Sequence, residues 1–104
     1  MKIKTIDITA KQWFDKANGN SYFSAQVTLD FGMKTQKIFR LPYQYGYGNH
    51  YTQIAKEELN KRFKLNIPDI MALWRYCQDH KIILRTDKHE NCLKKDVVNY
   101  GWNI

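Results

Sequence analysis

The sequence predicts an α+β fold in which an antiparallel β-meander of three to four strands packs on two α-helices, with a short C-terminal β segment. Three observations support this prediction: alternating apolar residues before residue 42, apolar residues at helical spacing between residues 51 and 77, and turn-forming residues between these segments. A chain of 104 residues, 43% of them hydrophobic, can bury a core of its own, so we expect a single domain over residues 1–104.

The first half of the chain carries the strand patterns. We expect strands over residues 2–8 and 11–16, followed by a two-residue hairpin turn at Asn18-Gly19, the dipeptide that type I′ turns prefer. This turn would place Phe14 opposite Phe23. In the next strand every second residue is apolar, which predicts one buried face. That face consists of Phe23, Ala25, Val27, Leu29 and Phe31.

A further strand is expected over residues 35–41, after a three-residue turn at residues 32–34. This loop length points Phe39 and Leu41 into the core and Arg40 away from it, whereas a two-residue loop would reverse all three. We expect Pro42 to end the strand, because proline has no backbone N–H for the sheet ladder.

Two helices are expected after the strands. Asn49 is a suitable N-cap for the first helix, and the second is expected over residues 68–80. The apolar stripe of the first consists of Tyr51, Ile54, Ala55, Leu59 and Phe63, and that of the second of Ile70, Leu73, Trp74 and Cys77. Beyond them, we expect a short strand at 82–84, a polar turn at 87–91 and a final strand at 97–102.

The net charge is +7, from 17 Lys and Arg against 10 Asp and Glu. A basic domain attracts phosphate groups through its overall field, which favours a nucleic-acid partner, although the same charge also promotes solubility. No apolar run approaches the ~20 residues of a membrane span, and residues 1–10 lack the apolar core of a signal peptide. With only two cysteines, we expect a protein of the reducing cytoplasm.

The outward face of the meander combines aromatic, basic and amide side chains. Such a face can stack nucleobases and neutralise phosphates. The side chains expected there are Lys11, Trp13, Tyr22, Ser24, Gln26 and Arg40. The alternative is that the first strand or the C-terminal segment covers Trp13 and Tyr22.

A tyrosine-rich segment, "YQYGYGNHY", joins the last strand of the meander to the first helix. We expect Tyr43 and Tyr51 to close one end of the core, while Tyr45 and Tyr47, which flank Gly46, are available to a partner. His50 lies at the expected helix N-terminus, where backbone amides favour an anion, and joins the candidate contacts. Lys11, Trp13, Tyr22, Arg40, Tyr45, Tyr47 and His50 form the complete candidate set.

Cys77-x2-His80 and His89-x2-Cys92 have the spacing of paired zinc ligands. Against a zinc site, Cys77 also belongs to an apolar helix stripe, and a histidine at a helix end is favourable without any metal. No nucleophile elbow, zinc-protease motif or paired carboxylates are present, so we expect a protein that is not an enzyme and needs no cofactor other than this tentative zinc.

The runs "WFDKANGNSYFSAQV" and "LPYQYGYGNHYTQIA" resemble a pattern found in short phage-encoded proteins for which no activity is established. The residues that carry the resemblance are Trp13, Phe14, Lys16, Asn18, Gly19, Asn20, Tyr22, Ser24, residues 45–51 and Ala55. The resemblance implies a viral or prophage setting and a three-stranded sheet leading into a helix, without implying a reaction.

These observations together predict a small, basic, non-enzymatic accessory protein of phage type that binds nucleic acid, DNA or RNA. The aromatic and basic sheet face and the tyrosine-rich loop would make the contacts. The alternative is a phage-encoded inhibitor of a host defence complex, similar in action to anti-CRISPR or anti-nuclease proteins. Tyrosine-rich loops suit such protein–protein contacts equally well, because tyrosine offers a large contact area at low entropic cost.

Overall fold

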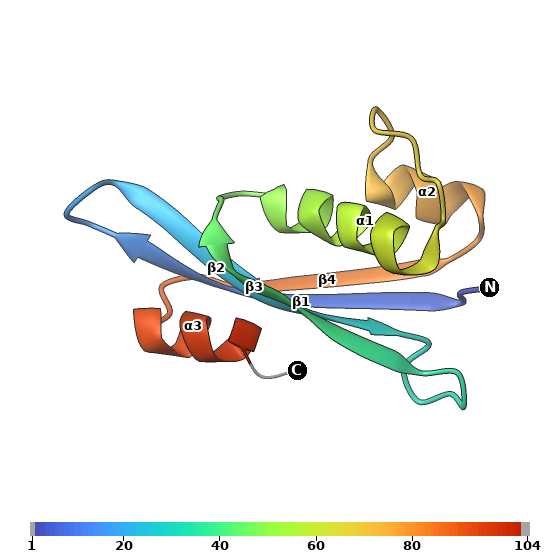
Figure 1. Ribbon diagram of the computed structural model, residues 1–104, viewed down its shortest axis with the longest axis horizontal. Coiled ribbons are helices and arrows are strands. Elements are labelled where there is room, and N and C mark those ends of the chain that lie inside the picture. Colours follow the sequence, from blue (N-terminus) through green and yellow to red (C-terminus); the bar gives the residue numbers. More distant parts are fainter. Residues whose placement is uncertain (1, 103–104) are drawn as a thin grey trace.

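The computed structural model describes residues 2–102. Its elements in chain order are β1 (Thr5–Asp15), β2 (Asn20–Leu29), β3 (Lys37–Tyr45), α1 (His50–Phe63), α2 (Leu73–Asp79), β4 (Ile83–His89) and α3 (Lys94–Trp102). α1 and α2 lie on one side of the sheet, and α3 lies on the other (Figure 1). The fold is therefore α+β, as predicted, but helices cover both faces of its sheet. Within residues 2–102, no helix is long and apolar enough to cross a membrane.

The sheet has the order β3-β2-β1-β4. β1 and β3 are antiparallel to β2, whereas β4 is parallel to β1, so the prediction of a purely antiparallel meander is wrong. The two strands expected over residues 2–8 and 11–16 are one continuous strand, β1. No glycine, proline or asparagine interrupts the chain between them, and Ala10 continues the buried face of Ile6 and Ile8.

The β1–β2 connection is longer than the predicted two-residue turn. The Asp15 carboxylate accepts hydrogen bonds from the Ala17 amide (3.1 Å) and the Asn18 side chain (2.8 Å), which stabilises a wider loop. Gly19, with a φ of 70°, closes the loop by donating to the Asp15 carbonyl (2.7 Å). As a result, Phe14 pairs with Ser21 and not with Phe23. This slip of two residues preserves the faces, because side chains alternate with a period of two.

β3 continues through Pro42, so the predicted end of the strand is wrong. An edge strand tolerates proline because the missing N–H can face away from the neighbouring strand. The register shifts between Phe23 and Ala25 of β2, which accommodates the extra residue as a bulge. The predicted orientation is confirmed, because Phe39 and Leu41 are 2% and 1% exposed.

The connection between β2 and β3 spans residues 30–36 and not the three residues expected. Asp30 has a φ of 52°, and its buried carboxylate accepts hydrogen bonds from the Lys4 amide (2.7 Å) and the Thr35 hydroxyl (2.8 Å). This turn interrupts the alternation after Leu29. Phe31, which was expected in the core, is therefore 65% exposed.

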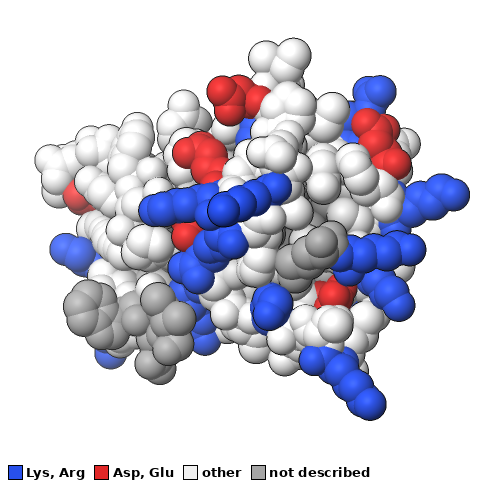
Figure 2. Space-filling model, turned by 45° about the vertical axis from the view of Figure 1, so that its right-hand side comes forward, with Lys and Arg blue, Asp and Glu red and all other residues white. Residues whose placement is uncertain are grey.

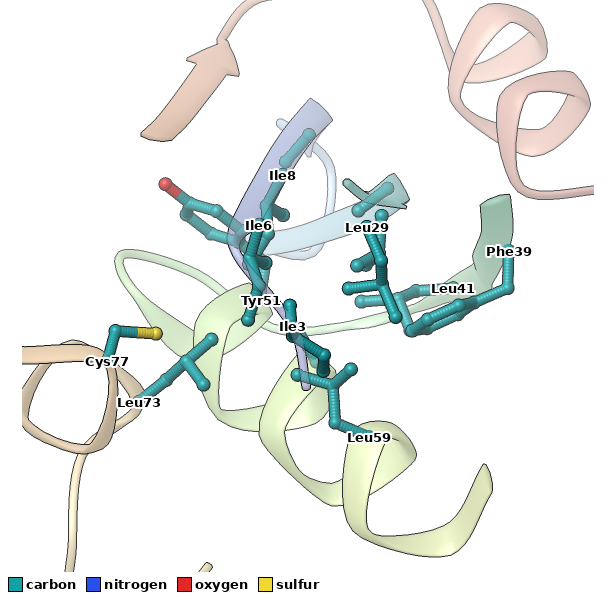
Figure 3. Close-up of a cluster of buried hydrophobic side chains, with 14 of the residues drawn as sticks. Ile3, Ile6, Ile8, Leu29, Phe39, Leu41, Tyr51, Leu59, Leu73 and Cys77 are labelled. Atoms are coloured by element: carbon teal, nitrogen blue, oxygen red, sulfur yellow. The ribbon is translucent and has the colours of Figure 1, made fainter. Parts of the chain in front are cut away.

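The core lies between the sheet and the pair α1 and α2 (Figure 3). The predicted apolar stripe of α1 is confirmed, with Tyr51, Ala55 and Leu59 buried and Ile54 and Phe63 partly buried against the core. Asn49 precedes α1 as expected, but its side chain makes no capping hydrogen bond. The alternating face of β2 is buried over Phe23, Ala25, Val27 and Leu29.

α2 is shorter than predicted, and only Leu73 and Cys77 of its expected stripe are buried. Ile70 and Trp74 are 99% and 61% exposed, so their assignment to the core is wrong. The segment before α2 is irregular because the buried Lys56 of α1 holds its backbone. The lysine Nζ donates to the carbonyls of Pro68 (3.4 Å), Asp69 (2.9 Å) and Met71 (3.0 Å).

The C-terminal part of the chain differs most from the prediction. β4 extends through His89 and so includes part of the expected polar turn at residues 87–91. Residues 97–102, which were predicted as a strand, belong to the helix α3. Val97 and Gly101, four residues apart, are buried on one side of this helix, so helical spacing and not alternation describes the segment.

Candidate nucleic-acid interface

α3 packs on the sheet face that the sequence marks as a binding surface. The Ser24 hydroxyl of β2 donates to the Val97 carbonyl of α3 (2.5 Å). A Cβ added to Gly101 would lie 2.7 Å from the Ser24 Cβ and 2.9 Å from the Tyr43 amide nitrogen, so the helix backbone touches the sheet. No space remains for a nucleobase at this point. The C-terminal helix therefore covers the middle of this face at Ser24, whereas Trp13 and Tyr22, which the alternative expected to be covered, are half-buried.

Lys11 and Arg40 contact α3 through Tyr100. The Lys11 Nζ and the Arg40 guanidinium carbon lie 4.6 and 4.7 Å from the centre of the Tyr100 ring. Arg40 also donates from Nη1 to the Tyr100 carbonyl (2.5 Å). Burial raises the pKa of the Tyr100 phenol above its ordinary value, so the ring is neutral near pH 7. Both cations thus hold α3 in place while still contributing to the positive field.

A shallow hollow of about 260 Å³ lies beside these cations. Its lining residues are Lys11, Arg40, Asp96, Asn99 and Tyr100. The Asp96 carboxylate shares this hollow with the two cations, and a carboxylate repels an anion such as phosphate. The hollow is therefore a weaker anion site than its two cations alone would suggest.

Beyond α3, aromatic rings gather at the hairpin end of the sheet. Trp13 stacks on Tyr22 with ring centres 5.8 Å apart, because β1 and β2 place these residues opposite each other. Tyr22 meets Tyr43 and Tyr45 edge-on, at 5.2 and 5.9 Å. Lys94 of α3 lies over the Trp13 ring, 5.4 Å from its centre. We call the four rings of Trp13, Tyr22, Tyr43 and Tyr45 the aromatic cluster.

In the tyrosine-rich loop, the exposure of Tyr45 and Tyr47, at 56% and 67%, and the burial of Tyr51 in the core are as predicted. Tyr43 was expected to close the core beside Tyr51, but it is only partly buried and packs on Tyr22 in the aromatic cluster. The loop and the start of α1 enclose a hollow of about 390 Å³, which we call the loop pocket. It is lined by Tyr45, Gly46, Tyr47, Asn49 and His50. Tyr45 belongs to both the aromatic cluster and the loop pocket, so the two form one continuous aromatic surface.

Gly46 shapes the floor of the loop pocket. The His50 ring packs edge-on against Phe23, with ring centres 6.0 Å apart. A Cβ added to Gly46 would lie 2.6 Å from an atom of each of these rings. The pocket therefore depends on a residue without a side chain at this position, and His50 is held by packing although it is exposed to solvent.

Positive charge is not confined to this surface (Figure 2). Figure 2 shows Lys and Arg side chains spread over the face that it presents, with Asp and Glu side chains between them. Lys94 lies beside the aromatic cluster, and Lys88 donates to the Gly48 carbonyl (3.1 Å) behind the loop pocket. A dispersed charge of this kind attracts a polyanion over a distance and does not fix it in one register.

The four tentative zinc ligands do not converge. Cys77 and His80 precede β4, whereas His89 ends it and Cys92 follows it. The seven residues of β4 separate the two pairs by roughly 20 Å, at the ~3.3 Å rise of a strand residue. Within residues 2–102, no three His, Cys, Asp or Glu side chains are placed to hold a metal ion.

Each of these side chains also has a local role. Burial raises the pKa of the Cys77 thiol to about 11, which keeps it protonated near pH 7. The His80 ring stacks on Tyr76 at 4.0 Å, and His89 lies 3.2 Å from the Asp87 carboxylate. Cys92 donates from its thiol to the His89 carbonyl (3.2 Å).

Two residues that complete the interface, Lys94 and Tyr100, were not among the predicted candidates. They lie on α3, and the spacing of Val97 and Gly101 was the available signal for this helix. No protein-family model matches the chain, and neither does any curated protein or solved structure. The function must therefore be inferred from the geometry of the chain itself.

Proposed function

We propose that the protein binds nucleic acid at the hairpin end of its sheet, as a small non-enzymatic accessory protein of phage type in the host cytoplasm. The observation that carries the proposal is the continuous surface formed by the aromatic cluster and the loop pocket. This surface ends in two well-exposed rings, Tyr45 and Tyr47, and lies beside Lys94. It belongs to a chain with a net charge of +7.

The physical argument combines stacking with charge. Each base stacked on an aromatic ring is worth ~1–3 kcal/mol, and every base offers a π-face, so stacking tolerates any sequence. The positive field adds a term that does not depend on sequence and weakens as salt rises, because binding releases counterions. Trp13, Tyr22, Tyr45, Tyr47, His50 and Lys94 are the proposed direct contacts. Lys11 and Arg40, whose positions are tied to Tyr100, contribute mainly through the field.

Fluorescence anisotropy with labelled oligonucleotides tests this function. We expect binding at about 50 mM salt that weakens steeply by about 200 mM. The double variant Tyr45→Ala/Tyr47→Ala should lose at least about tenfold in affinity, since two stacking rings are removed. Phe31→Ala is the control, because Phe31 is a 65% exposed ring that lies beyond the far end of β2, away from the hairpin. No binding at the lower salt concentration would overturn the proposal.

A second candidate function, inhibition of a host defence complex by protein–protein contact, is favoured by a different region. Ile70 and Trp74 are 99% and 61% exposed and line a hollow of about 420 Å³ with Met71. The three hydrogen bonds from Lys56 hold the backbone before α2. A partner that binds Ile70 would therefore pay little entropy for ordering this segment. Tryptophan is also enriched among the residues that dominate protein–protein binding energy.

A cleavage assay with a purified RNA-guided nuclease complex separates the two functions. Under the inhibitor hypothesis, Trp74→Ser relieves inhibition, while its affinity for free oligonucleotides remains that of the wild type. If Tyr45→Ala/Tyr47→Ala relieves inhibition and Trp74→Ser does not, nucleic-acid binding alone accounts for the effect. Absence of inhibition by the wild-type protein would count against the second candidate for that complex.

A further inference from the structure

We infer that the loop pocket receives one unpaired nucleobase, so that the protein prefers single-stranded over double-stranded nucleic acid. This inference rests on the proposed nucleic-acid binding and specifies its ligand. It assigns separate tasks to the two parts of the interface. The pocket takes a base out of the strand, and the aromatic cluster supports the neighbouring bases.

The size and walls of the pocket suit a flat aromatic group. Its volume of about 390 Å³ is near the lower end of the ~300–1,000 Å³ that small-molecule sites occupy. Two of its five lining residues are tyrosines with exposed rings, and a third is His50. A planar base can stack on such rings, whereas a bulky aliphatic group would leave their faces poorly matched.

The chemistry of the lining favours a base over a phosphate. The five lining residues include no lysine or arginine. Asn49 makes no side-chain capping hydrogen bond with α1, so its amide is not committed to the helix N-terminus. An asparagine amide both donates and accepts hydrogen bonds, and this combination matches the edge of a nucleobase. Phosphates are therefore expected outside the pocket, towards lysines such as Lys94.

The position of the pocket explains the preference for single strands. Tyr45 contacts Tyr22 of the aromatic cluster on one side and lines the pocket on the other. A strand that stacks on the aromatic cluster therefore passes Tyr45, where one base can enter the pocket. In a duplex, both faces of each base are already stacked and its pairing edge is occupied, so entry into the pocket would require unpairing.

The inference is tested by anisotropy with four probes: a labelled single strand, the same strand in a duplex, the same strand with one central abasic site, and a strand with several adjacent abasic sites. We expect the single strand to bind about tenfold more tightly than the duplex. One abasic site should have little effect, because the protein can shift along the strand. Adjacent abasic sites should reduce the affinity to that of the duplex.

Variants of Tyr47 test the pocket directly. Tyr47 is 67% exposed, so its replacement should leave the fold intact, which circular dichroism can verify. Tyr47→Phe keeps the ring and should keep the preference for single strands. Tyr47→Leu removes the ring and should reduce the ratio of single-strand to duplex affinity to less than about threefold. If the wild-type protein bound single strand and duplex with equal affinity, the inference that the pocket receives an unpaired base would be overturned, while nucleic-acid binding itself would stand. No binding to any probe would overturn both.

Discussion

The two faces of the sheet are covered in different ways. On the α1 side, β1, β2 and β3 contribute a continuous apolar layer, and Leu59 and Ala55 of α1 pack on it without any exposure to solvent. On the α3 side, Ser24 and Arg40 bond to carbonyls of the helix, and two cations enclose the Tyr100 ring. On the α3 side, polar and charged side chains of the strands therefore serve as internal packing residues and do not form a free binding surface.

The two kinds of contact also differ in strength. Burial of one large apolar side chain contributes about 1.5–3 kcal/mol. An internal hydrogen bond contributes about 0.5–1.5 kcal/mol, and a cation–π contact about 0.5–2 kcal/mol. We therefore expect the α1 side to provide most of the stability and the α3 side to be more easily disturbed. Three changes, to Leu59, Gly101 and Arg40, test this difference with progressively smaller losses, and a fourth tests a polar anchor just after β2.

Leu59→Ala should cause the largest loss. Leu59 is fully buried between α1 and the sheet, and its truncation leaves a cavity as well as removing apolar contact. We expect the free energy of unfolding to fall by about 3 kcal/mol, measured by urea denaturation. Lys61→Ala, an exposed position on the same helix, should change it by less than about 0.5 kcal/mol. Similar losses in both variants would mean that this side is not the main core.

Gly101→Ala should disturb the α3 side through the backbone. The new Cβ would lie 2.8 Å from the Leu41 carbonyl oxygen, so α3 or β3 must shift. We expect a loss of about 2 kcal/mol, even though alanine favours a helix over glycine by about 1 kcal/mol. Asn99→Ala, on the exposed side of α3, should be neutral or slightly stabilising. A gain of stability in Gly101→Ala would show that α3 does not pack closely on β3.

Arg40→Met keeps the length of the side chain but removes its charge and its hydrogen bond to Tyr100. We expect a loss of about 1 kcal/mol, because one hydrogen bond and one cation–π contact disappear. Hydrogen exchange should become faster in α3 and remain unchanged in α1. Lys37→Met, which removes an exposed cation from the same strand, serves as the control. Faster exchange in both helices would mean that the two sides open together.

The smallest effect concerns Asp30, a polar anchor just after β2, and shows in how the stability of the wild type depends on pH. Burial tends to raise the pKa of Asp30, but hydrogen bonds from the Lys4 and Thr5 amides and the Thr35 hydroxyl outweigh it, so the pKa is lowered overall. The carboxylate therefore stabilises the fold above its unfolded pKa of about 3.9. This contribution is lost as the pH falls through the lower folded pKa.

Urea denaturation at several pH values between about 5 and about 2 measures this dependence. Asp30→Asn should flatten the acid limb of the stability curve and lower the plateau at neutral pH. Asp69→Asn, an exposed carboxylate outside this network, should leave the slope almost unchanged. Equal slopes for the wild type and Asp30→Asn would contradict the role assigned to this carboxylate.

Sequence-based prediction succeeded where the apolar repeat of an element faces the core and failed where a distant residue decides the local structure. The alternation of β2 and the stripe of α1 both face the apolar core, and each repeats with the period of its own element, so both could be recognised locally. The apolar stripe predicted for α2 was wrong at Ile70 and Trp74. Lys56 of α1 donates hydrogen bonds to backbone carbonyls of the segment before α2, and the helix begins only at Leu73. Of the candidate site, the exposure of Tyr45 and Tyr47 was predictable, whereas the commitment of Lys11 and Arg40 to Tyr100 was not.

Sequence reasoning alone predicted the α+β class, the inward faces of β2, β3 and α1, and the exposure of Tyr45 and Tyr47. These features follow from local periodicity and from the turn residues that flank each segment. The parallel pairing of β4 with β1 and the position of α3 across the sheet became clear only from the folded chain. Such choices depend on which distant segments meet, and contacts of this kind leave no repeating pattern in either segment.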